Sequence, residues 1–303
     1  MVSAAADGAN EPIHAPPKGA WLLYRVGAAR IFAHREGKEM GSPSRLFIGS
    51  VKTTARRVLG LERPHVLVAC MPKSASTFLA DVLAKLPGIR HAPLTWAYGW
   101  REQTLDVVQL ARYDLASYVC QQHLRYSADV GNLIVEYRLT PVVLTRNVFD
   151  VVASIRDHFR NESTESPMVP LGPKHAKLGD AALEELIADL VAPWYVSFFV
   201  SWQGVDSLRV TFDQVRTSPS EVVSRICERA GIRTDERGIT RAIEAAHAKA
   251  RRFNKGVSGR GEGISPKARE RIVSLARHFP DVDFTPIGIA RPDAGAAVRV
   301  ERE

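Results

Sequence analysis

The chain has 303 residues, of which 45% are hydrophobic and 24% are charged, and its net charge is +8. This composition is typical of a globular protein and excludes a disordered or fibrous one, and a chain of this length can bury a large core as one α/β domain. The three cysteines are far apart in the sequence. That spacing argues against a disulfide framework or a zinc site and fits a reducing compartment. No apolar run reaches the roughly 20 residues of a transmembrane helix.

The excess of positive charge is scattered along the chain rather than gathered in one block. It suits an anionic small ligand, a nucleic acid or an anionic membrane, and it does not by itself choose among them.

Residues 1–60 are expected to form an N-terminal extension. Residues 1–19 are rich in Ala, Gly and Pro and lack the apolar core of a secretory signal, so we expect them to be disordered. Residues 21–32 mix apolar side chains with Arg and predict a short amphipathic helix. This helix either packs on the edge of the domain or lies on a membrane surface. We therefore expect a cytoplasmic protein, with peripheral membrane contact through this stretch as one alternative.

The most informative stretch covers residues 64–79 and reads PHVLVACMPKSASTFL. Residues 66–70 predict a buried strand, Pro72 ends it, and apolar residues recur at helical spacing from Phe78 onward. Backbone N–H groups at the start of such a helix favour an anion, and Lys73 adds a full charge. The stretch predicts a phosphate-binding loop, with an ordinary strand-to-helix turn as the alternative. It is not a Walker A loop, because the Lys comes first and no glycine is near.

A second strand followed by a helix is predicted between residues 141 and 159. The apolar strand ends at Arg146, Asn147 can cap the helix, and Asp150 lies in its first turn. Ser154 lies about two turns into the helix. Arg146 and Ser154 can therefore face one crevice and bind a second phosphate, whereas an Arg146–Asp150 ion pair is the structural alternative.

His123 follows a predicted strand end at residues 118–120. Ligands of α/β sheets bind at the carboxyl ends of the strands, so His123 is a candidate catalytic group, although a lone His is more often structural. His91 is the rival candidate, because it lies in an aromatic-rich stretch at residues 89–101. That stretch either lines a substrate pocket or forms a packed surface loop.

The remaining expectations follow in chain order. Residues 180–201 predict a helix that Pro193 kinks or divides, and residues 161–179 predict a mobile loop over the acceptor site. Further predicted elements are a strand at 207–211, a helix at 221–230, and a last helix capped by Ser265 with Pro266 at its first position. We expect one domain over residues 61–290 and a flexible tail over 291–303.

Residues 72–78, PKSASTF, resemble the PKSGTTW loop of the sulfotransferases that use 3′-phosphoadenosine-5′-phosphosulfate (PAPS). The resemblance implies that this loop binds the 5′-phosphosulfate through Lys73, Ser74, Ala75, Ser76, Thr77 and Phe78. Ala75 stands where the family has Gly, so its Cβ is an obstacle to close approach of a phosphate.

Residues 145–154 look like the family's Arg-x-Pro-x-Asp-x-x-x-Ser segment, which implies that Arg146 and Ser154 hold the 3′-phosphate. His123 and Leu124 lie where the family has Thr-His-Leu-Pro, which implies that His123 is the catalytic base.

Two later segments also resemble the family. Residues 210–214 are similar to its Tyr-Glu-Asp segment, which implies that Phe212 lies near the adenine. Residues 254–259 look like its Arg-Lys-Gly-x-x-Gly loop, which implies a further 3′-phosphate clamp from Asn254, Lys255 and Gly256. Asn254 stands where the family has Arg.

The resemblance spans about residues 64–288 and implies a single α/β domain, with a central parallel β-sheet flanked by helices in the P-loop NTPase-like sulfotransferase fold. It also implies in-line transfer of a sulfuryl group from PAPS to a hydroxyl or amine, leaving 3′,5′-adenosine bisphosphate (PAP). Lys73 would stabilise the bridging oxygen, Ser74 would hold Lys73 away until the acceptor arrives, and His123 would take the acceptor's proton.

No metal is expected, and the acceptor is expected to be a small molecule, a lipid or a carbohydrate rather than a nucleic acid. Three alternatives are a P-loop kinase-like phosphotransferase, a non-catalytic module that binds a nucleotide or an anionic glycan, and a nucleic-acid or membrane-surface protein, which only the net charge favours.

Overall fold

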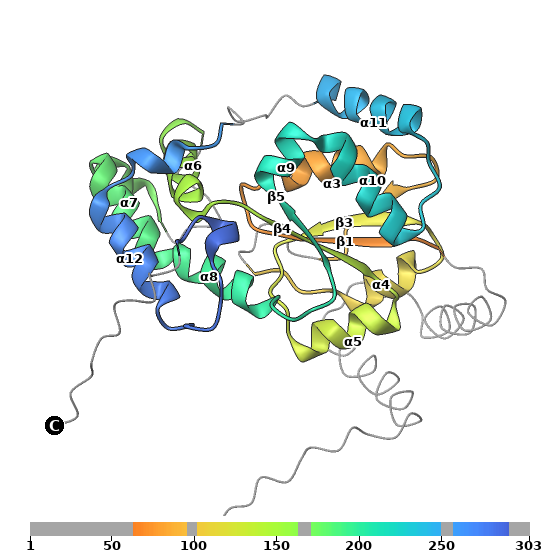
Figure 1. Ribbon diagram of the computed structural model, residues 1–303, viewed down its shortest axis with the longest axis horizontal. Helices are drawn as coiled ribbons and strands as arrows, with labels where there is room; N and C mark the ends of the chain where they lie inside the picture. The colour runs from red at the N-terminus through yellow and green to blue at the C-terminus, as the bar shows by residue number, and fades with distance from the viewer. Residues whose placement is uncertain (1–62, 96–101, 163–170, 250–256, 291–303) are drawn as a thin grey trace, which may run out of the picture. The chain divides into compact units, whose positions relative to one another are not determined.

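The computed structural model describes residues 63–95, 102–162, 171–249 and 257–290 (Figure 1). The predicted N-terminal extension with its amphipathic helix and the predicted C-terminal tail lie outside these residues. No helix of the described part of the chain is long and apolar enough to cross a membrane.

The centre of the domain is a five-stranded sheet in the order β2-β3-β1-β4-β5, in which every neighbouring pair is parallel. The strands are β1 (His65–Cys70), β2 (Arg90–His91), β3 (Tyr118–Gln122), β4 (Thr140–Thr145) and β5 (Leu208–Thr211). The central strand β1 is buried along its whole length. Parallel sheets covered on both faces have such continuous apolar strands, which is why β1 and β4 were visible in the sequence.

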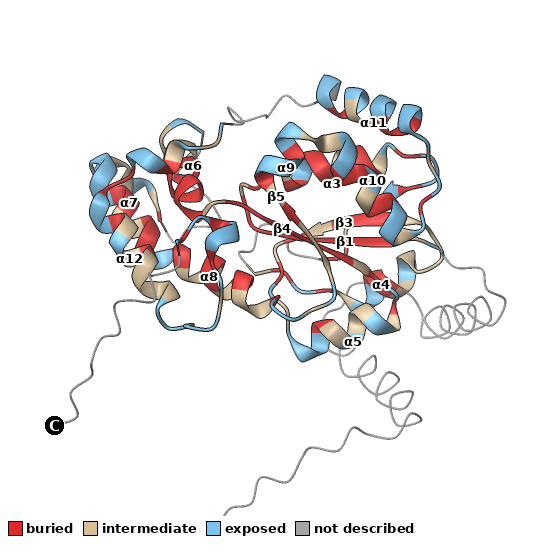
Figure 2. Ribbon diagram, in the orientation of Figure 1, coloured by how far each residue is buried: buried red, intermediate tan, exposed pale blue. Residues whose placement is uncertain are grey.

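Helices pack on both faces of this sheet (Figure 1). They are α3 (Ser76–Ala84), α4 (Val107–Tyr113), α5 (Ala128–Glu136), α6 (Val148–Asn161), α7 (Asp180–Leu190), α8 (Ala192–Ser201), α9 (Phe212–Thr217), α10 (Pro219–Ala230), α11 (Glu236–Lys249) and α12 (Pro266–Ala276). Residues of α3, α10 and α11 pack in one buried cluster with Val66 and Val68 of β1. Residues of α4 to α8 and α12 pack in a second cluster with Leu67 and Ala69 on the opposite face. The helices α7 and α12 pack on each other and on neighbouring helices beside the sheet (Figure 1). In Figure 2 the strands are mostly buried, and the exposed residues lie mainly on the outer sides of the helices. The predicted fold class is confirmed.

The strongest local signals in the sequence correspond to observed elements. Asn147 caps α6, because its side chain accepts hydrogen bonds from the backbone N–H groups of Phe149 and Asp150. Ser265 caps α12 in the same way through the N–H of Ala268. The predicted helix at 180–201 is divided into α7 and α8, and its proline lies in the first turn of α8.

Other elements were not predicted. The stretch 89–112, which carries little sequence pattern, contains the two-residue strand β2 and the helix α4. Two apolar residues of α4, Val107 and Val108, are exposed. Apolar side chains in this helix therefore do not mark its buried face, and the sequence pattern that normally identifies an amphipathic helix is missing. The predicted loop at 161–179 contains a short 3₁₀ helix at Pro173–Lys177.

Candidate active site

The carboxyl ends of the parallel strands lie at one edge of the sheet and are followed by the predicted site residues. Lys73 follows β1, His123 follows β3, Arg146 follows β4, and Phe212 follows β5. Open α/β sheets bind ligands at this edge. The fold therefore brings together groups that are up to 139 positions apart, the separation between residues 73 and 212.

The loop after β1 is held in an unusual backbone conformation. Lys73 and Ala75 both have left-handed backbone angles, with φ of 64° and 65°. A left-handed residue other than glycine costs about 1–2 kcal/mol, and such strain is concentrated at functional sites. Ala75 is also the N-cap of α3 and provides no side-chain cap for it. The first N–H groups of α3 therefore have no side-chain cap and suit an anion.

Lys73 is half-buried, and its ammonium group has no hydrogen bond or ion pair with any described residue. The pKa of Lys73 is lower than usual, mainly because the group is partly buried and to a smaller extent because of the nearby charge of Arg146; the negative charge of Glu162 partly opposes this. A partly desolvated cation with no fixed counter-ion is suited to stabilise an anionic ligand.

The hydroxyl of Ser74 is not paired with Lys73. Ser74 is buried, and its Oγ donates to the carbonyl oxygen of Met71 within the loop. Beyond it, Ser76 is buried and Thr77 is exposed at the start of α3.

His123 is joined to the strand that precedes the loop. Its Nδ1 donates to the carbonyl oxygen of Cys70 over 3.0 Å. A carbonyl can only accept, so the proton is on Nδ1 and the lone pair is on Nε2, as a general base requires. Burial lowers the pKa of His123, and the Cys70 carbonyl partly opposes this. The Cys70 thiol lies 3.4 Å from Nδ1, and burial raises its pKa to about 12, so it stays protonated.

Gln103 fixes the backbone of His123, a contact that the sequence did not reveal. The N–H of His123 donates to Oε1 of Gln103 over 2.8 Å, and the N–H of Gln103 donates to the His123 carbonyl over 2.9 Å. The neighbouring Glu102 carboxylate accepts from the Arg125 guanidinium over 2.9 Å and from the Trp194 indole over 2.5 Å. The segment that carries the candidate base is therefore anchored at both ends.

The aromatic helix α8 belongs to the core and contacts two loops of the site. The hydroxyl of Tyr195 donates to the Pro72 carbonyl over 3.2 Å. The indole N–H of Trp202 donates to the Leu124 carbonyl over 3.0 Å. Both bonds satisfy loop carbonyls that flank Lys73 and His123 in the sequence.

Arg146 connects three segments of the site. Its guanidinium donates to the Lys73 carbonyl over 2.7 Å and to the Val257 carbonyl over 3.1 Å. Its Cζ atom lies 3.9 Å from the centre of the Phe212 ring. Arg146 is 6% exposed, and its buried Nε has no hydrogen-bond partner among the described residues. Burial lowers its pKa, although the group stays charged at any ordinary pH.

Asp150 does not form the alternative ion pair with Arg146. Its buried carboxylate accepts from the N–H groups of Gly259, over 3.1 Å, and Gly261, over 2.6 Å. A Cβ at Gly261 would lie 2.5 Å from the backbone of Phe149, so this close approach requires glycine. Asp150 therefore fixes the late loop onto the start of α6.

The other predicted site residues have different surroundings. Ser154 is buried on α6, and its hydroxyl has no hydrogen-bond partner in the described part of the chain. The Phe78 ring lies 4.7 Å from the ring of His247 on α11. Asn254, Lys255 and Gly256 lie outside the described residues. The rival base, His91, is exposed on the edge strand β2, with β3 between it and β1.

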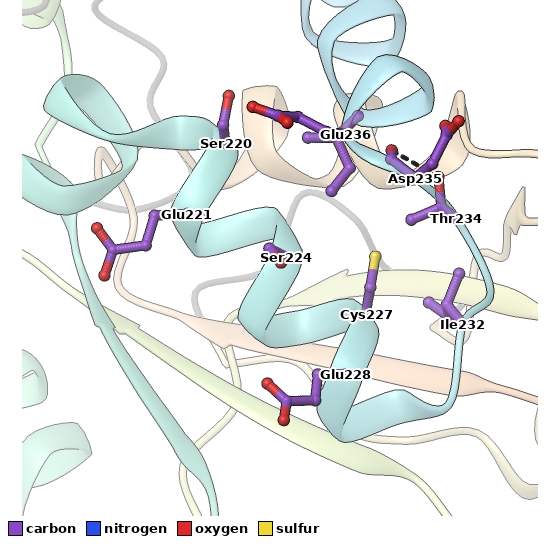
Figure 3. A pocket seen from close by; sticks show the side chains of 10 residues that line it. Ser220, Glu221, Ser224, Cys227, Glu228, Ile232, Thr234, Asp235 and Glu236 are labelled. Atoms are coloured by element: carbon purple, nitrogen blue, oxygen red, sulfur yellow. Dashed lines mark hydrogen bonds between the residues drawn. The ribbon is translucent and has the colours of Figure 1, made fainter.

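A hollow of about 490 Å³ lies between α10 and the start of α11 (Figure 3). It has four carboxylates, from Glu221, Glu228, Asp235 and Glu236, and includes none of the predicted site residues. Its charge would repel a phosphorylated ligand, so we do not place the nucleotide there. Among the described residues, no three His, Cys, Asp or Glu side chains are grouped to hold a metal ion.

Solved sulfotransferases are similar to this chain. For mouse SULT7A1 complexed with PAP, the TM-score is 0.52 at 17% identity, covering 71% of this chain and 83% of that chain. For the sulfotransferase from Alicyclobacillus acidocaldarius, the TM-score is 0.43 at 16% identity, and the match covers 71% of this chain and 92% of that chain. For STF9 from Mycobacterium avium, the TM-score is 0.45 at 11% identity, and the match covers 77% of this chain and 80% of that chain.

No protein-family model and no curated protein matches the sequence. The similarity to the mouse structure, together with the parallel sheet described above, shows that this chain has the sulfotransferase fold.

Proposed function

We propose that this protein is a sulfotransferase that uses PAPS as its donor. The observation that carries the proposal is the hydrogen bond from His123 Nδ1 to the Cys70 carbonyl. In the neutral ring it fixes the Nδ1–H tautomer, which leaves Nε2 to accept a proton, at the same strand end that leads into Lys73. A base and a cation that forms no ion pair with any described residue lie on one sheet edge, and these are the groups that transfer to an acceptor hydroxyl needs.

The described residues fit an anionic nucleotide with two phosphate positions. The N-terminus of α3 and the Lys73 ammonium have no side-chain partner among them, and these groups would hold the 5′-phosphosulfate. Ser76 and Thr77 lie in the same turn, and Phe78 follows. The Nε of Arg146 and the hydroxyl of Ser154, which have no hydrogen-bond partner in the part of the chain that the structure describes, would hold the 3′-phosphate.

Three further residues belong to the proposed nucleotide site by their resemblance to the family. They are Asn254, Lys255 and Gly256, which directly precede the loop that Arg146 and Asp150 contact. Phe212, next to Arg146, would lie near the adenine. The mouse neighbour is described as complexed with PAP, the product that PAPS leaves, and this supports the assignment.

The chemistry follows from the positions of the charged and polar groups. PAPS supplies an activated sulfuryl group. Lys73 stabilises the negative charge that develops on the bridging oxygen when the S–O bond breaks, and His123 Nε2 takes the proton of the acceptor. The Ser74 hydroxyl donates its proton to the Met71 carbonyl, so restraint of Lys73 by Ser74 would use a lone pair of the Ser74 Oγ as the acceptor of a hydrogen bond from the ammonium group.

The proposed domain covers residues 61–290, and its acceptor is a small molecule, a lipid or a carbohydrate. We place the reaction in the cytoplasm, because Cys70, Cys120 and Cys227 are all unpaired and buried. Peripheral membrane contact through residues 21–32 is part of the same proposal.

The test uses nucleotide binding and transfer together. PAP should raise the melting temperature of the full chain far more than ATP or AMP does, because only PAP carries both a 3′- and a 5′-phosphate. Lys73→Ala should lower transfer of labelled sulfate from PAPS to pooled cell metabolites by more than about 100-fold and weaken PAP binding less.

Lys85→Ala, at the exposed C-terminal end of α3, is the matched control and should behave like the wild type. Equal stabilisation by ATP and PAP, or full transfer by a folded Lys73→Ala variant, would refute the proposal.

A further inference from the structure

Four consecutive carbonyl groups, from the end of β1 into the loop after it, each accept a hydrogen bond from a side chain. The pairs are His123 with Cys70, Ser74 with Met71, Tyr195 with Pro72, and Arg146 with Lys73. Three of the donors come from other parts of the fold, namely the residues directly after β3 and β4 and the helix α8. Because the peptide unit is planar, a fixed carbonyl oxygen also fixes the plane that carries it. The orientation of this loop is therefore held from several sides.

Two of these bonds hold the backbone of Lys73. The angle φ of a residue depends on the orientation of the peptide plane before it, and ψ depends on the plane after it. The Tyr195 hydroxyl holds the plane before Lys73 over 3.2 Å, and the Arg146 guanidinium holds the plane after it over 2.7 Å. Lys73 has a φ of 64°, which is unfavourable for a residue with a Cβ atom. Such a conformation persists only where surrounding contacts hold it.

Tyr195 makes its bond from inside the core. It is 1% exposed, so it has no surface for a bound nucleotide to contact, and it packs among the apolar residues of α7 and α8. The next buried aromatic residues of α8, Phe198 and Phe199, carry no hydroxyl. A buried hydroxyl is unfavourable unless it is hydrogen-bonded, so its presence at Tyr195 is explained by the Pro72 carbonyl.

We propose that Tyr195 is a positioning residue, whose hydroxyl, together with Arg146, holds Lys73 in the left-handed conformation that aims its ammonium group at the donor. The backbone angles of Lys73 set the direction of its Cα–Cβ bond, so a change in them displaces the ammonium group. A displacement of about 1 Å can lower an enzymatic rate by about 100-fold. This inference rests on the proposed sulfotransferase function and deepens it, because it extends the machinery of the site to helix α8.

Tyr195 allows a cleaner test than Arg146, since Arg146 is itself assigned to the 3′-phosphate. The first test measures urea unfolding without any nucleotide. While Tyr195 holds the left-handed conformation, Lys73→Gly should have a higher urea midpoint than Lys73→Ala, because glycine adopts a positive φ without strain. When each is combined with Tyr195→Phe, the order should reverse, because glycine then contributes only its entropy cost. An equal advantage of glycine in both backgrounds, or none in either, would overturn the proposal.

Tyr118→Phe is the matched control. Tyr118 also carries a buried hydroxyl, but it begins β3 and therefore lies at the opposite edge of the sheet. This hydroxyl has no hydrogen-bond partner among the described residues. Combined with Tyr118→Phe, Lys73→Gly should keep its higher urea midpoint over Lys73→Ala, and Tyr118→Phe alone should leave the transfer rate unchanged.

The second test measures transfer from PAPS. Tyr195→Phe should lower kcat by about 10- to 100-fold, while the Kd for PAP stays within about two-fold of the wild-type value. In the Lys73→Ala background, the same substitution should change kcat by less than about two-fold, because the ammonium group that Tyr195 positions is gone. Equal losses of kcat in both backgrounds would show that Tyr195 supports the fold in general, which contradicts the proposal.

The positioning role and the proposed function fail in different ways. If the wild type neither binds PAP nor transfers sulfate from PAPS, the sulfotransferase function is refuted. The comparison of Lys73→Gly with Lys73→Ala needs no nucleotide, so it still decides whether Tyr195 holds the backbone of Lys73. It also decides the matter if the residual rate of Lys73→Ala is too low to measure.

Discussion

Replacement of Asp150 should destabilise the domain strongly, because its carboxylate is the anchor of the late loop. It accepts two backbone hydrogen bonds, from Gly259 and Gly261, in a site where Asp150 is buried. A hydrogen bond to a charged group contributes about 1.5–3 kcal/mol. Asp150→Ala removes both bonds, so the free energy of unfolding should fall by about 3–6 kcal/mol. Asp150→Asn keeps one acceptor oxygen and should lose about half of that.

The assay is urea unfolding followed by circular dichroism. With a slope of about 1–3 kcal/mol per M, the midpoint for Asp150→Ala should fall by at least about 1 M. Asp129→Ala is the control, because Asp129 lies in the first turn of α5 but is exposed. It should lose only the interaction with the helix dipole, about 0.3–1 kcal/mol. Because Arg146 contacts the same loop through Val257, Asp150→Asn should also weaken PAP binding.

Two results would refute this reasoning. A loss below about 1 kcal/mol for Asp150→Ala would mean that the two backbone bonds do not hold the loop. A double-mutant cycle with Arg146→Ala that shows a coupling energy above about 1.5 kcal/mol would mean that an ion pair with Arg146 is the main contribution.

Three further predictions concern the site. Ala75→Gly should raise the free energy of unfolding by up to about 1 kcal/mol, because relief of the left-handed strain exceeds the entropy cost of glycine. It should also tighten PAP binding. A lower free energy of unfolding in urea would contradict the first of these expectations. Burial lowers the pKa of His123, so the folded protein disfavours the protonated imidazole. The free energy of unfolding should therefore be unaffected by this group above the unfolded pKa of about 6.5 and should decrease as the pH falls below that value. A plot of the wild-type transfer rate against pH should therefore rise at a pH below about 6.5. His123→Ala should lower the rate by about 10²–10⁴-fold, and its residual rate should not show this rise. A rise that persists in the variant would assign the titration to another group. Gln103→Leu removes the acceptor of the His123 N–H bond, so it should lower kcat by about 10-fold without changing the Kd for PAP. Gln103→Glu keeps an acceptor oxygen and should retain most of the wild-type rate. Loss of PAP binding in Gln103→Leu would instead indicate a general structural defect.

The sequence alone determined the elements whose signals are local. A continuous apolar run marks a strand that is buried on both faces, and this identified β1 and β4. A capping side chain acts on N–H groups two or three residues away, so Asn147 and Ser265 were sufficient to place the starts of α6 and α12. The order of these elements, with Lys73 and Arg146 directly after strands, was enough to predict the sheet edge on which the site lies.

Only the tertiary structure decided how the site residues are held, because their partners are distant in the sequence. Arg146 binds the Val257 carbonyl 111 positions away, and Tyr195 binds the Pro72 carbonyl 123 positions away. Asp150 looked like a partner for Arg146 but binds two backbone N–H groups of a later loop. The burial of the Gln122 amide, which has no hydrogen-bond partner among the described residues, was also hidden, because burial depends on the packed sheet and not on one strand. Local propensity sets where elements begin and end, whereas the contacts between them depend on which surfaces pack together.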